Sequence, residues 1–404
     1  MSSLQKNLWV LPFLIAGCGG GSAKPPTIIT DDPSDIPLAG ADADMVARFR
    51  AGDRLFGITF REPDGLGPVY IRSACSGCHA DAARGPGSVQ KMAVVLDDGV
   101  TPGDQSELLY GHSVRGQLAA GGMTPVEPPD DPHVKVTVRA APAVLGRGYI
   151  DAIDEAEVRR VAAEQAMRPD AIHGVVNEVT YQSQANPDTR FHQYQPGQPG
   201  LVGRFGLKAR IATIDDFVAD AAQGDMSMTS ALRPTELPNP DNLADDDKLG
   251  PDLDADTINA IADYMRLIAI PTRPTPSPEA VQLFNDTLCA VCHVPSLKTR
   301  ADYPYAPLAG VDAPVFTDLL LHDMGTEHGD GLADGSATST QWKTPPLIAL
   351  RLMKSYLHDG RAKTIADAIE GHAGDGSEAT DSLALFHALS AAQQQTLIDY
   401  VTGL

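Results

Sequence analysis

Cys75-Ser76-Gly77-Cys78-His79 and Cys289-Ala290-Val291-Cys292-His293 decide how this chain folds, because the same C-x-x-C-H pattern occurs once in each half. In this pattern two cysteine thiols add across the vinyl groups of a haem, and the adjacent histidine binds the iron as an axial ligand. Cys18 is the one cysteine outside the two motifs. The sequence therefore predicts two covalently bound haem c groups, attached through Cys75, Cys78, Cys289 and Cys292, with His79 and His293 as proximal iron ligands.

Two other interpretations of paired cysteines fit the pattern less well. A thioredoxin-like dithiol does not need a histidine directly after its second cysteine, and here that histidine occurs twice. A zinc site would have its cysteine pairs about 15–20 residues apart. The two pairs of this chain lie in different halves of the sequence. The haem interpretation is the one that explains both motifs.

The composition indicates a globular and strongly acidic protein. Its 404 residues are 43% hydrophobic, and 53 acidic against 31 basic side chains give a formal net charge of -22. Such a charge repels phosphate backbones, so we do not expect nucleic-acid binding. An acidic surface can instead attract a basic partner, and we expect a small soluble redox protein as electron donor or acceptor. Many acidic proteins are simply soluble, so charge alone names no partner.

The N-terminal residues resemble a bacterial lipoprotein signal. An apolar stretch too short to span a bilayer ends in Leu14-Ile15-Ala16-Gly17-Cys18, which is similar to the lipobox in which the cysteine becomes the lipidated first residue. We expect a signal peptide over residues 1–18, lipidation of Cys18 and a flexible stalk over 19–44. The protein would then be anchored in the bacterial cell envelope, facing the periplasm from the outer membrane. The alternative is an ordinary signal peptide with a chance cysteine.

Repeated segments around the two motifs predict the domain organisation. Residues 256–267 and 390–401 share an apolar face with a tyrosine at the same place, which is typical of a closing helix. Four prolines between Pro271 and Pro278 preclude a continuous helix there. We expect a mainly α fold with two cytochrome c-like haem domains. These domains cover residues 45–270 and 279–404, the linker covers 271–278, and the first domain carries a large insertion between about Thr124 and Gly200.

A further repeat suggests distal ligands for the two irons. Thr213 and Thr364 each precede an aspartate by three residues, which predicts the start of a short helix. The first of these segments leads to Met226 and Met228 and the second to His372. We therefore predict Met226 or Met228 as the distal ligand of the first haem and His372 as that of the second. The other candidates are His112 and Met123 for the first iron, and Met324, His322 and His358 for the second.

The C-terminal half resembles a known family. Three of its segments carry the likeness most clearly: Thr317-Asp318-Leu319-Leu320-Leu321-His322-Asp323-Met324-Gly325, Trp342-Lys343-Thr344-Pro345-Pro346-Leu347 and Leu357-His358-Asp359-Gly360-Arg361-Ala362. They are similar to bacterial di-haem oxidoreductases, including those labelled thiol oxidoreductases, and Gly203-Arg204-Phe205-Gly206-Leu207-Lys208-Ala209 extends the likeness upstream. A more distant likeness is to di-haem cytochrome c peroxidases. It implies that the distal ligand of the C-terminal haem follows the His358 motif, where His372 stands.

The chain also departs from these relatives. The family commonly has Trp-His-Gly-Gly-Glu where this chain has Gly371-His372-Ala373-Gly374-Asp375. The tryptophan that lies between the haems of the peroxidases has no counterpart in the N-terminal half after the signal segment. This difference leaves a peroxidase-style electron relay without its usual residue.

Three residues are candidates for catalysis. His322 and the pair His358 and Asp359 could line a distal pocket, where a histidine and a carboxylate would serve proton transfer. The alternative is that Asp359 makes a turn with Gly360 while the histidines bond to haem propionates or to backbone.

Three functional classes follow. The first is a membrane-anchored oxidoreductase that transfers electrons between a redox partner and a small substrate, with peroxide and thiols as candidates. The second is an electron carrier in which both haems are six-coordinate. The third is a haem-containing binding or assembly lipoprotein without turnover.

Overall fold

The computed structural model describes residues 33–80, 85, 87–119, 121–243 and 249–404. The predicted signal peptide, Cys18 and most of the predicted stalk lie outside these residues. The ten α-helices of the described part are α1 (Ala43–Gly57), α2 (Arg147–Ala152), α3 (Glu155–Gln165), α4 (Ile214–Met226), α5 (Ala255–Leu267), α6 (Pro278–Asp286), α7 (Cys289–Cys292), α8 (Ile365–Glu370), α9 (Thr380–Ala388) and α10 (Ala391–Gly403).

The strands form five antiparallel pairs. They are β1 (Val69–Tyr70) with β3 (Gln117–Leu118), β2 (Ser88–Val94) with β4 (Val134–Ala140), β5 (Glu178–Val179) with β6 (Leu201–Val202), β7 (Leu297–Lys298) with β8 (Asp312–Ala313), and β9 (Leu321–Asp323) with β10 (Gln341–Lys343). The prediction of a mainly α fold is wrong, because the chain is 33% helical with 14% strand.

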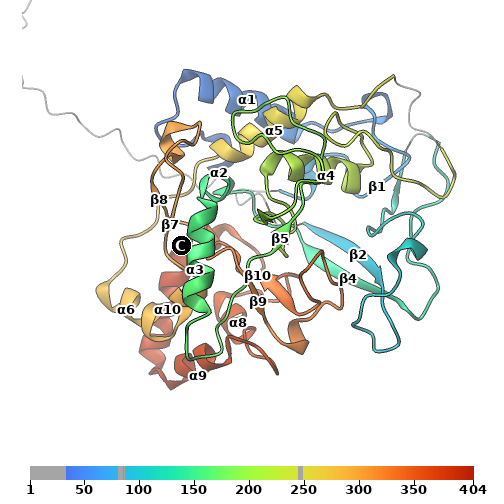
Figure 1. Ribbon diagram of the computed structural model, residues 1–404. Helices are drawn as coiled ribbons and strands as arrows, with labels where there is room; N and C mark the ends of the chain where they lie inside the picture. The colour runs from blue at the N-terminus through green and yellow to red at the C-terminus, as the bar shows by residue number, and fades with distance from the viewer. Residues whose placement is uncertain (1–32, 81–84, 86, 120, 244–248) are drawn as a thin grey trace, which may run out of the picture.

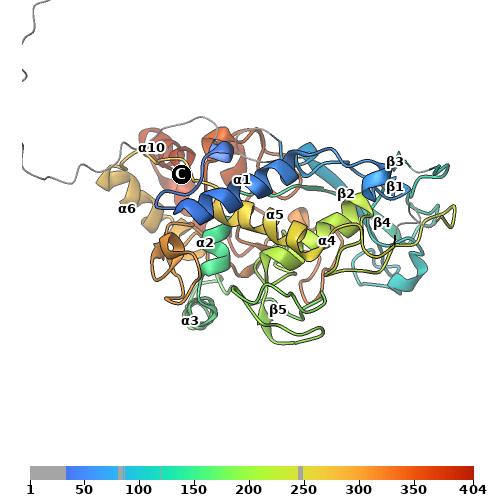
Figure 2. The same ribbon diagram turned by 90° about the horizontal axis from the view of Figure 1, so that it is seen from above.

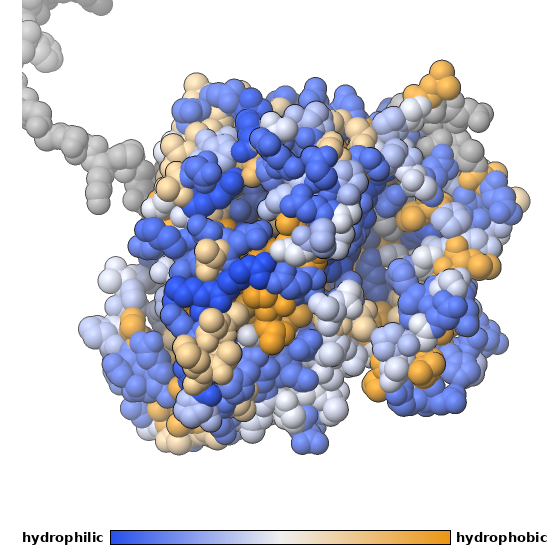
Figure 3. All heavy atoms as spheres, in the orientation of Figure 1, coloured by the Kyte–Doolittle hydropathy of each residue, from blue (hydrophilic) through white to orange (hydrophobic). Residues whose placement is uncertain are grey.

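The β2–β4 pair explains part of this error. Val134, Val136 and Val138 alternate with polar residues, which is the period of a strand, although Val136 and Val138 are exposed. The two strands pair from Ser88 with Ala140 to Val94 with Val134, and β2 contributes Met92 and Val94 to a small apolar cluster. They lie at the end of the molecule opposite α6 and α10 (Figures 1 and 2). Apolar spots on the surface of this lobe are visible in Figure 3.

The predicted closing helices are confirmed. They are α5 and α10, and each packs on the helix that precedes a C-x-x-C-H motif: α5 on α1, and α10 on α6. Gly52 of α1 allows the close approach, because a Cβ at this position would lie 1.9 Å from the carbonyl oxygen of Ala260. The predicted helix starts are confirmed as well. The Thr213 hydroxyl accepts a hydrogen bond from the backbone N–H of Asp216, and the Thr364 hydroxyl accepts one from that of Asp367.

The largest apolar core joins the two halves of the chain. Phe49 and Tyr264 from the first half belong to the same buried cluster as Leu308 and Ile348 from the second. A second cluster, around Phe284, fills the space between α6, α9 and α10. The segment predicted as an insertion also packs on the second half, since the backbone N–H of Asp154 donates to the carbonyl of Lys298.

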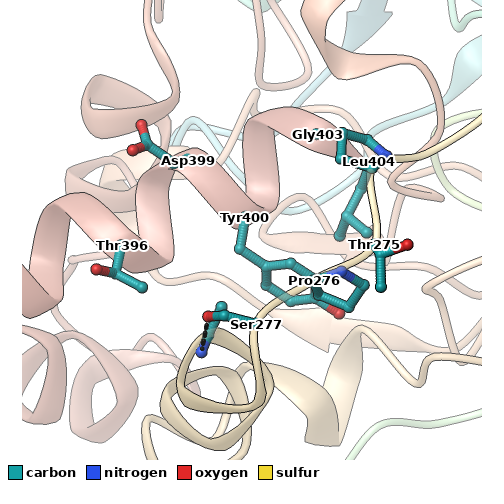
Figure 4. Close-up of a pocket in the computed structure, with 10 residues that line it drawn as sticks. Thr275, Pro276, Ser277, Thr396, Asp399, Tyr400, Gly403 and Leu404 are labelled. Atoms are coloured by element: carbon teal, nitrogen blue, oxygen red, sulfur yellow. Dashed lines mark hydrogen bonds between the residues drawn. The ribbon is translucent and has the colours of Figure 1, made fainter.

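The proline-rich segment forms no helix over residues 271–277, as its composition predicts, but Pro278 already begins α6. The segment is held against the C-terminal half. Arg273 donates hydrogen bonds to the backbone carbonyls of Leu404, Pro314 and Leu347. Its end forms a pocket of about 260 Å³ with α10, in which Tyr400 lies close to Pro276 and Ser277 (Figure 4). The N-terminal residues from Pro33 onward are packed too, since the N–H of Leu38 donates to the carbonyl of Leu267 at 2.6 Å.

A buried cluster of charges fixes α5 in the middle of the protein. Arg266 is 1% exposed, and its guanidinium donates to Asp151 at 2.9 Å and to Asp215 and Asp263 at 3.2 Å each. Burial opposes its charge, but the three carboxylates outweigh burial and hold the pKa of Arg266 well above its usual value. Asp215 and Asp263 have further partners, since Asp215 lies 2.9 Å from His192 and Asp263 lies 3.1 Å from Arg190. Among the described residues, Asp151 has no cation within ion-pair distance other than Arg266.

We predict that Arg266→Gln destabilises the protein by about 3–5 kcal/mol, because it leaves the Asp151 carboxylate without a cation and removes one partner each from the buried Asp215 and Asp263. The free energy of unfolding, measured by chemical denaturation with circular dichroism, tests this. Arg160→Gln is the matched control, since the Arg160 side chain is 50% exposed. Its ion pairs with Glu157 and Glu164 on the surface of α3 should contribute under about 1 kcal/mol. Equal losses in the two variants would contradict the role of Arg266.

Candidate functional site

The second C-x-x-C-H motif forms one tight helical turn. Leu288 adopts a positive φ of 62°, and α7 follows directly, with the backbone N–H of His293 donating to the carbonyl of Cys289 at 2.9 Å. This turn places both sulfurs and the histidine beside the same cavity. Burial raises the pKa of both thiols, Cys289 and Cys292. Without haem, both sulfurs would therefore stay protonated at neutral pH.

This cavity has a volume of about 300 Å³ and takes its walls from both halves of the chain. The segment Ala140–Leu145 comes from the first half, and Trp342, Tyr356 and Phe386 come from the second. The lining is mainly apolar, with a few polar side chains. A flat apolar ring system with polar substituents at its edge would fit such a space. Because the site draws on both halves, it depends on the packing between them.

His293 and His372 face each other in this cavity. Their ring centroids are 6.4 Å apart and their ring planes are inclined by 65°. The Nδ1–H of His293 donates to the carbonyl of Phe316 at 3.1 Å, and that of His372 donates to the carbonyl of Ala368 at 2.7 Å. Each ring is therefore left with Nε2 as its basic nitrogen. The separation leaves room for one metal ion at about 2 Å from a nitrogen of each ring.

The protonation states of the two rings suit metal binding. Burial lowers the pKa of His293 to about 4, and burial also lowers the pKa of His372. Both imidazoles are therefore neutral near pH 7, which is the form that binds a metal. The predicted role of His372 as distal ligand stays a prediction, although the structure places it opposite the proximal histidine. The alternative ligands Met324, His322 and His358 line the same cavity.

His322 lies beside the haem-attachment cysteine, between two carboxylates. Its Nε2 is 2.8 Å from Asp318 and its Nδ1 is 2.6 Å from Glu378, while the sulfur of Cys292 lies 3.7 Å from Nδ1. Burial alone would lower the pKa of His322, but Asp318 and other nearby groups outweigh it and hold the pKa well above its usual value. The ring is thus a buried imidazolium whose two N–H groups are both engaged. Among the described residues, Cys292, Asp318 and His322 could also bind a metal ion.

His358 stacks on Trp342. The two rings are 3.9 Å apart and nearly parallel, at 14°. Burial lowers the pKa of His358 to about 4, so the ring is neutral at pH 7. Its neighbour Asp359 does not orient it, because that carboxylate accepts a hydrogen bond from Arg361 at 2.6 Å. The structure therefore places His322 and His358 at one cavity, whereas the Asp359 carboxylate pairs with Arg361. The proposed catalytic roles of all three remain predictions.

Four side chains at or beside this cavity escaped the sequence analysis. Asp318 and Glu378 hold His322, and the cations Arg147 and Lys343 line the cavity wall. Lys343 belongs to a segment that resembles the family, yet nothing in the sequence says that it faces this cavity. Arg147 lies in the segment predicted as an insertion, far from either cysteine pair in the sequence.

The first C-x-x-C-H motif forms a similar turn. The backbone N–H groups of Cys78 and His79 donate to the carbonyl of Cys75, at 3.2 and 2.9 Å. Burial raises the pKa of Cys75 to about 12. The ring of His79 lies 6.0 Å from that of Phe56 on α1, which in turn contacts the closing helix α5 through Tyr264. Its surroundings thus repeat those of the second motif, where α6 and α10 are the corresponding helices.

The predicted methionine ligands lie at the end of α4, next to this motif. The N–H of Ile71 donates to the carbonyl of Asp225 at 2.7 Å, which holds the end of α4 against the strand that leads to Cys75. Met226 is 5% and Met228 0% exposed. Met123, one of the alternatives, is 78% exposed. The structure thus brings the segment of Met226 to the first motif, while its role as iron ligand stays a prediction.

The donor set of the second site fits a covalently attached haem. Two thiols, two opposed neutral imidazoles and a mainly apolar wall are what such a group requires. Within the part of the chain that the structure describes, no helix is long and apolar enough to span a membrane.

A family model agrees with this chemistry. Residues 129–404 match the family model described as "Di-haem oxidoreductase, putative peroxidase". No curated protein matches the chain. Hydrazine synthase from Kuenenia stuttgartiensis, solved under 20 bar of xenon, is similar over 98% of this chain and 100% of that chain, at 12% identity and a TM-score of 0.39. A MauG-like protein associated with microbial copper homeostasis is similar over 95% of each chain, at 14% identity and a TM-score of 0.39.

We predict that His372→Ala removes an axial ligand and converts the second haem from low spin to high spin, as observed by paramagnetic resonance of the oxidised protein. His387→Ala is the control, since the His387 ring is 52% exposed on α9 and pairs with Glu370. At the first haem, Met226→Ala or Met228→Ala should give the same change. A spectrum that no variant alters would refute both ligand assignments.

Proposed function

Because the chain belongs to the family of di-haem oxidoreductases, we propose that it carries two covalently attached haem c groups and transfers electrons between a redox partner and a small substrate. The family assigns a haem-dependent redox activity. The covalent attachment, the number of haems and the direction of electron flow are our own inferences. Peroxide and thiols are the substrate classes that the sequence suggests.

The observation that carries this proposal is the opposition of His293 and His372 beside Cys289 and Cys292. A buried pair of neutral imidazoles, each fixed by a backbone carbonyl, has no evident structural purpose without a metal between them. When bound, the haem would supply one-electron redox chemistry at its iron. The protein would supply the thiols, the ligands and a wall that excludes water.

The two sites differ in the ligands that we assign to them. Histidine on both sides of an iron favours a lower potential, and methionine on one side favours a higher one. With His372 at the second haem and Met226 or Met228 at the first, the ligands would favour electron flow from the second haem to the first. A reaction with substrate then requires that one distal ligand is absent or can be displaced.

The remaining polar side chains suggest how protons are held near the second site. His322 carries a proton on each ring nitrogen, and both are committed to carboxylates. We propose that it fixes the position of Glu378 beside the haem attached at Cys292. His358, neutral and stacked on Trp342, has the basic nitrogen that a proton acceptor needs.

The cellular setting is also a proposal. We infer that Cys18 is lipidated and anchors the protein to the bacterial outer membrane, facing the periplasm, where haem c proteins meet small soluble electron carriers. The lipobox-like sequence and the net charge of -22 support this arrangement. Neither identifies the partner.

The test of an enzymatic role is ligand access to iron. We expect the purified, oxidised protein to contain one haem that binds cyanide and reacts with peroxide, observed as a change in the absorption and paramagnetic resonance spectra. An open or displaceable distal position would produce this change. Two low-spin haems that ignore both reagents would instead establish an electron carrier, and a protein that no partner reduces or oxidises would leave a binding or assembly role.

Lipid attachment has a separate test. Cells that express the protein should incorporate labelled palmitate into it and retain it in the membrane fraction, whereas Cys18→Ala should be unlabelled and should appear in the soluble periplasmic fraction. Cys18→Ala leaves both haem motifs intact, so its visible spectrum serves as the control for folding. An unlabelled native protein would contradict the anchor.

A further inference from the structure

Two buried cations line the second cavity without a carboxylate partner. Lys343 extends from β10 and Arg147 from α2, and each residue is 7% exposed. Arg147 donates through Nε and one Nη to a single carbonyl, that of Ala143. For the Lys343 ammonium, no hydrogen bond or ion pair is found with any residue that the structure describes. Both side chains contribute to the wall of the cavity.

Neighbouring cations show what a compensated site looks like in this protein. The Lys208 ammonium donates to three backbone carbonyls and lies 3.8 Å from Asp330. Arg139 forms ion pairs with Asp330 and Asp334, at 2.8 and 3.1 Å. Lys343 and Arg147 lack this compensation, so they are exceptions within the same region of the fold.

The isolation of the two cations is electrostatically unfavourable. Burial and, to a smaller extent, the nearby charge of Arg147 lower the pKa of Lys343 to about 7, although the Asp318 carboxylate offsets part of this effect. Burial also lowers the pKa of Arg147 to about 10. A buried charge without a counter-ion is costly, and two like charges in one cavity add to that cost. An anionic group bound between or beside them would remove both penalties.

The lining of the cavity limits which kinds of anion could bind there. The walls around the two cations are mainly apolar, and the cavity is shared with Cys289, Cys292 and His293. The ligand should therefore have an apolar body and one or two acidic groups. Carboxylates fit this description, and they accept hydrogen bonds from both ammonium and guanidinium groups.

We propose that Lys343 and Arg147 form a carboxylate-binding site in this cavity. The carboxylates have two possible sources: the propionate groups of the haem attached at Cys289 and Cys292, or a small anionic substrate. The first possibility rests on the proposed function, because it requires haem in this cavity. In either case the two side chains bind and position the ligand, and no covalent step is assigned to them.

The experiment compares Lys343→Gln and Arg147→Gln with the native haem protein. Lys298→Gln is the matched control, since it removes the same charge from the surface, where the Lys298 side chain is 54% exposed. Haem content is measured first, then the reduction potential of the second haem by potentiometric titration, and finally the affinity for acetate from the absorption spectrum. The His372→Ala variant identifies which potential belongs to the second haem.

If the site binds propionates, each variant should favour the ferric state of the second haem by about tenfold, because a nearby positive charge no longer stabilises the reduced form. For a one-electron couple, tenfold is about 59 mV. If the site binds a substrate anion instead, each variant should also lower the potential in acetate-free buffer, but acetate should bind the native protein at least about tenfold more tightly than either variant and should remove most of the difference in potential. If propionates occupy the site, acetate should not bind there. Both results support the site and distinguish its occupants.

An unchanged potential together with no acetate binding in the native protein would overturn the proposal. Lys343→Arg tests whether the effect of Lys343→Gln comes from a folding defect. This variant keeps the charge, so it should retain the native reduction potential and acetate affinity. If Lys343→Arg and Lys343→Gln show equal shifts, the effect is structural and the proposal fails. A native protein without covalently bound haem would instead refute the proposed function, so the two failures can be told apart.

Discussion

The paired histidines of the second site set the constraint on which the surrounding structure depends. Two neutral imidazoles can stay buried and opposed only if each Nδ1–H finds an acceptor and each Nε2 finds a partner. The carbonyls of Phe316 and Ala368 supply the acceptors. These carbonyls belong to segments on opposite sides of the cavity, one after β8 and one in α8. The helices α6, α9 and α10 hold the two segments apart at a separation that admits a metal ion.

The second site also depends on how the two halves of the chain pack together. The wall of the second cavity includes Ala140 to Leu145 from the first half. That segment is held there by the hydrogen bond from the N–H of Ala140 to the carbonyl of His358, and by the ion pair of Arg139 with Asp330. Loss of this packing would open the cavity to water, which would weaken every electrostatic interaction in it.

Features that depend on neighbouring residues could be predicted from the sequence, whereas contacts between distant segments could not. The caps at Thr213 and Thr364 depend on residues three positions away, and the closing helices depend on periodicity, so both were found. The β2–β4 pair was missed because we expected helical haem domains and did not interpret the alternation of valines with polar residues from Val134 to Val138 as a strand. Arg147 and Glu378 were missed for a different reason. Their roles arise from contacts with residues far away in the chain, which no local pattern records. Asp318 lies only four residues before His322, so its spacing to that histidine was a local signal that could have found it.

The charges around the second cavity oppose the effect of its ligands. Two histidine ligands favour a low reduction potential. The protein as a whole carries a net charge of -22, yet Lys343 and Arg147 lie at this cavity. The imidazolium of His322 adds no net positive charge there, because Asp318 and Glu378 flank it. Buried positive charge stabilises the reduced iron, and a single charge about 10 Å away changes the equilibrium about tenfold at an effective dielectric constant of about 20. With the two haems that we propose, ligand type alone would therefore not order the two potentials. The order would also depend on how far bound carboxylates neutralise these cations, so the charge in this cavity would influence the direction of electron flow as well as the iron ligands.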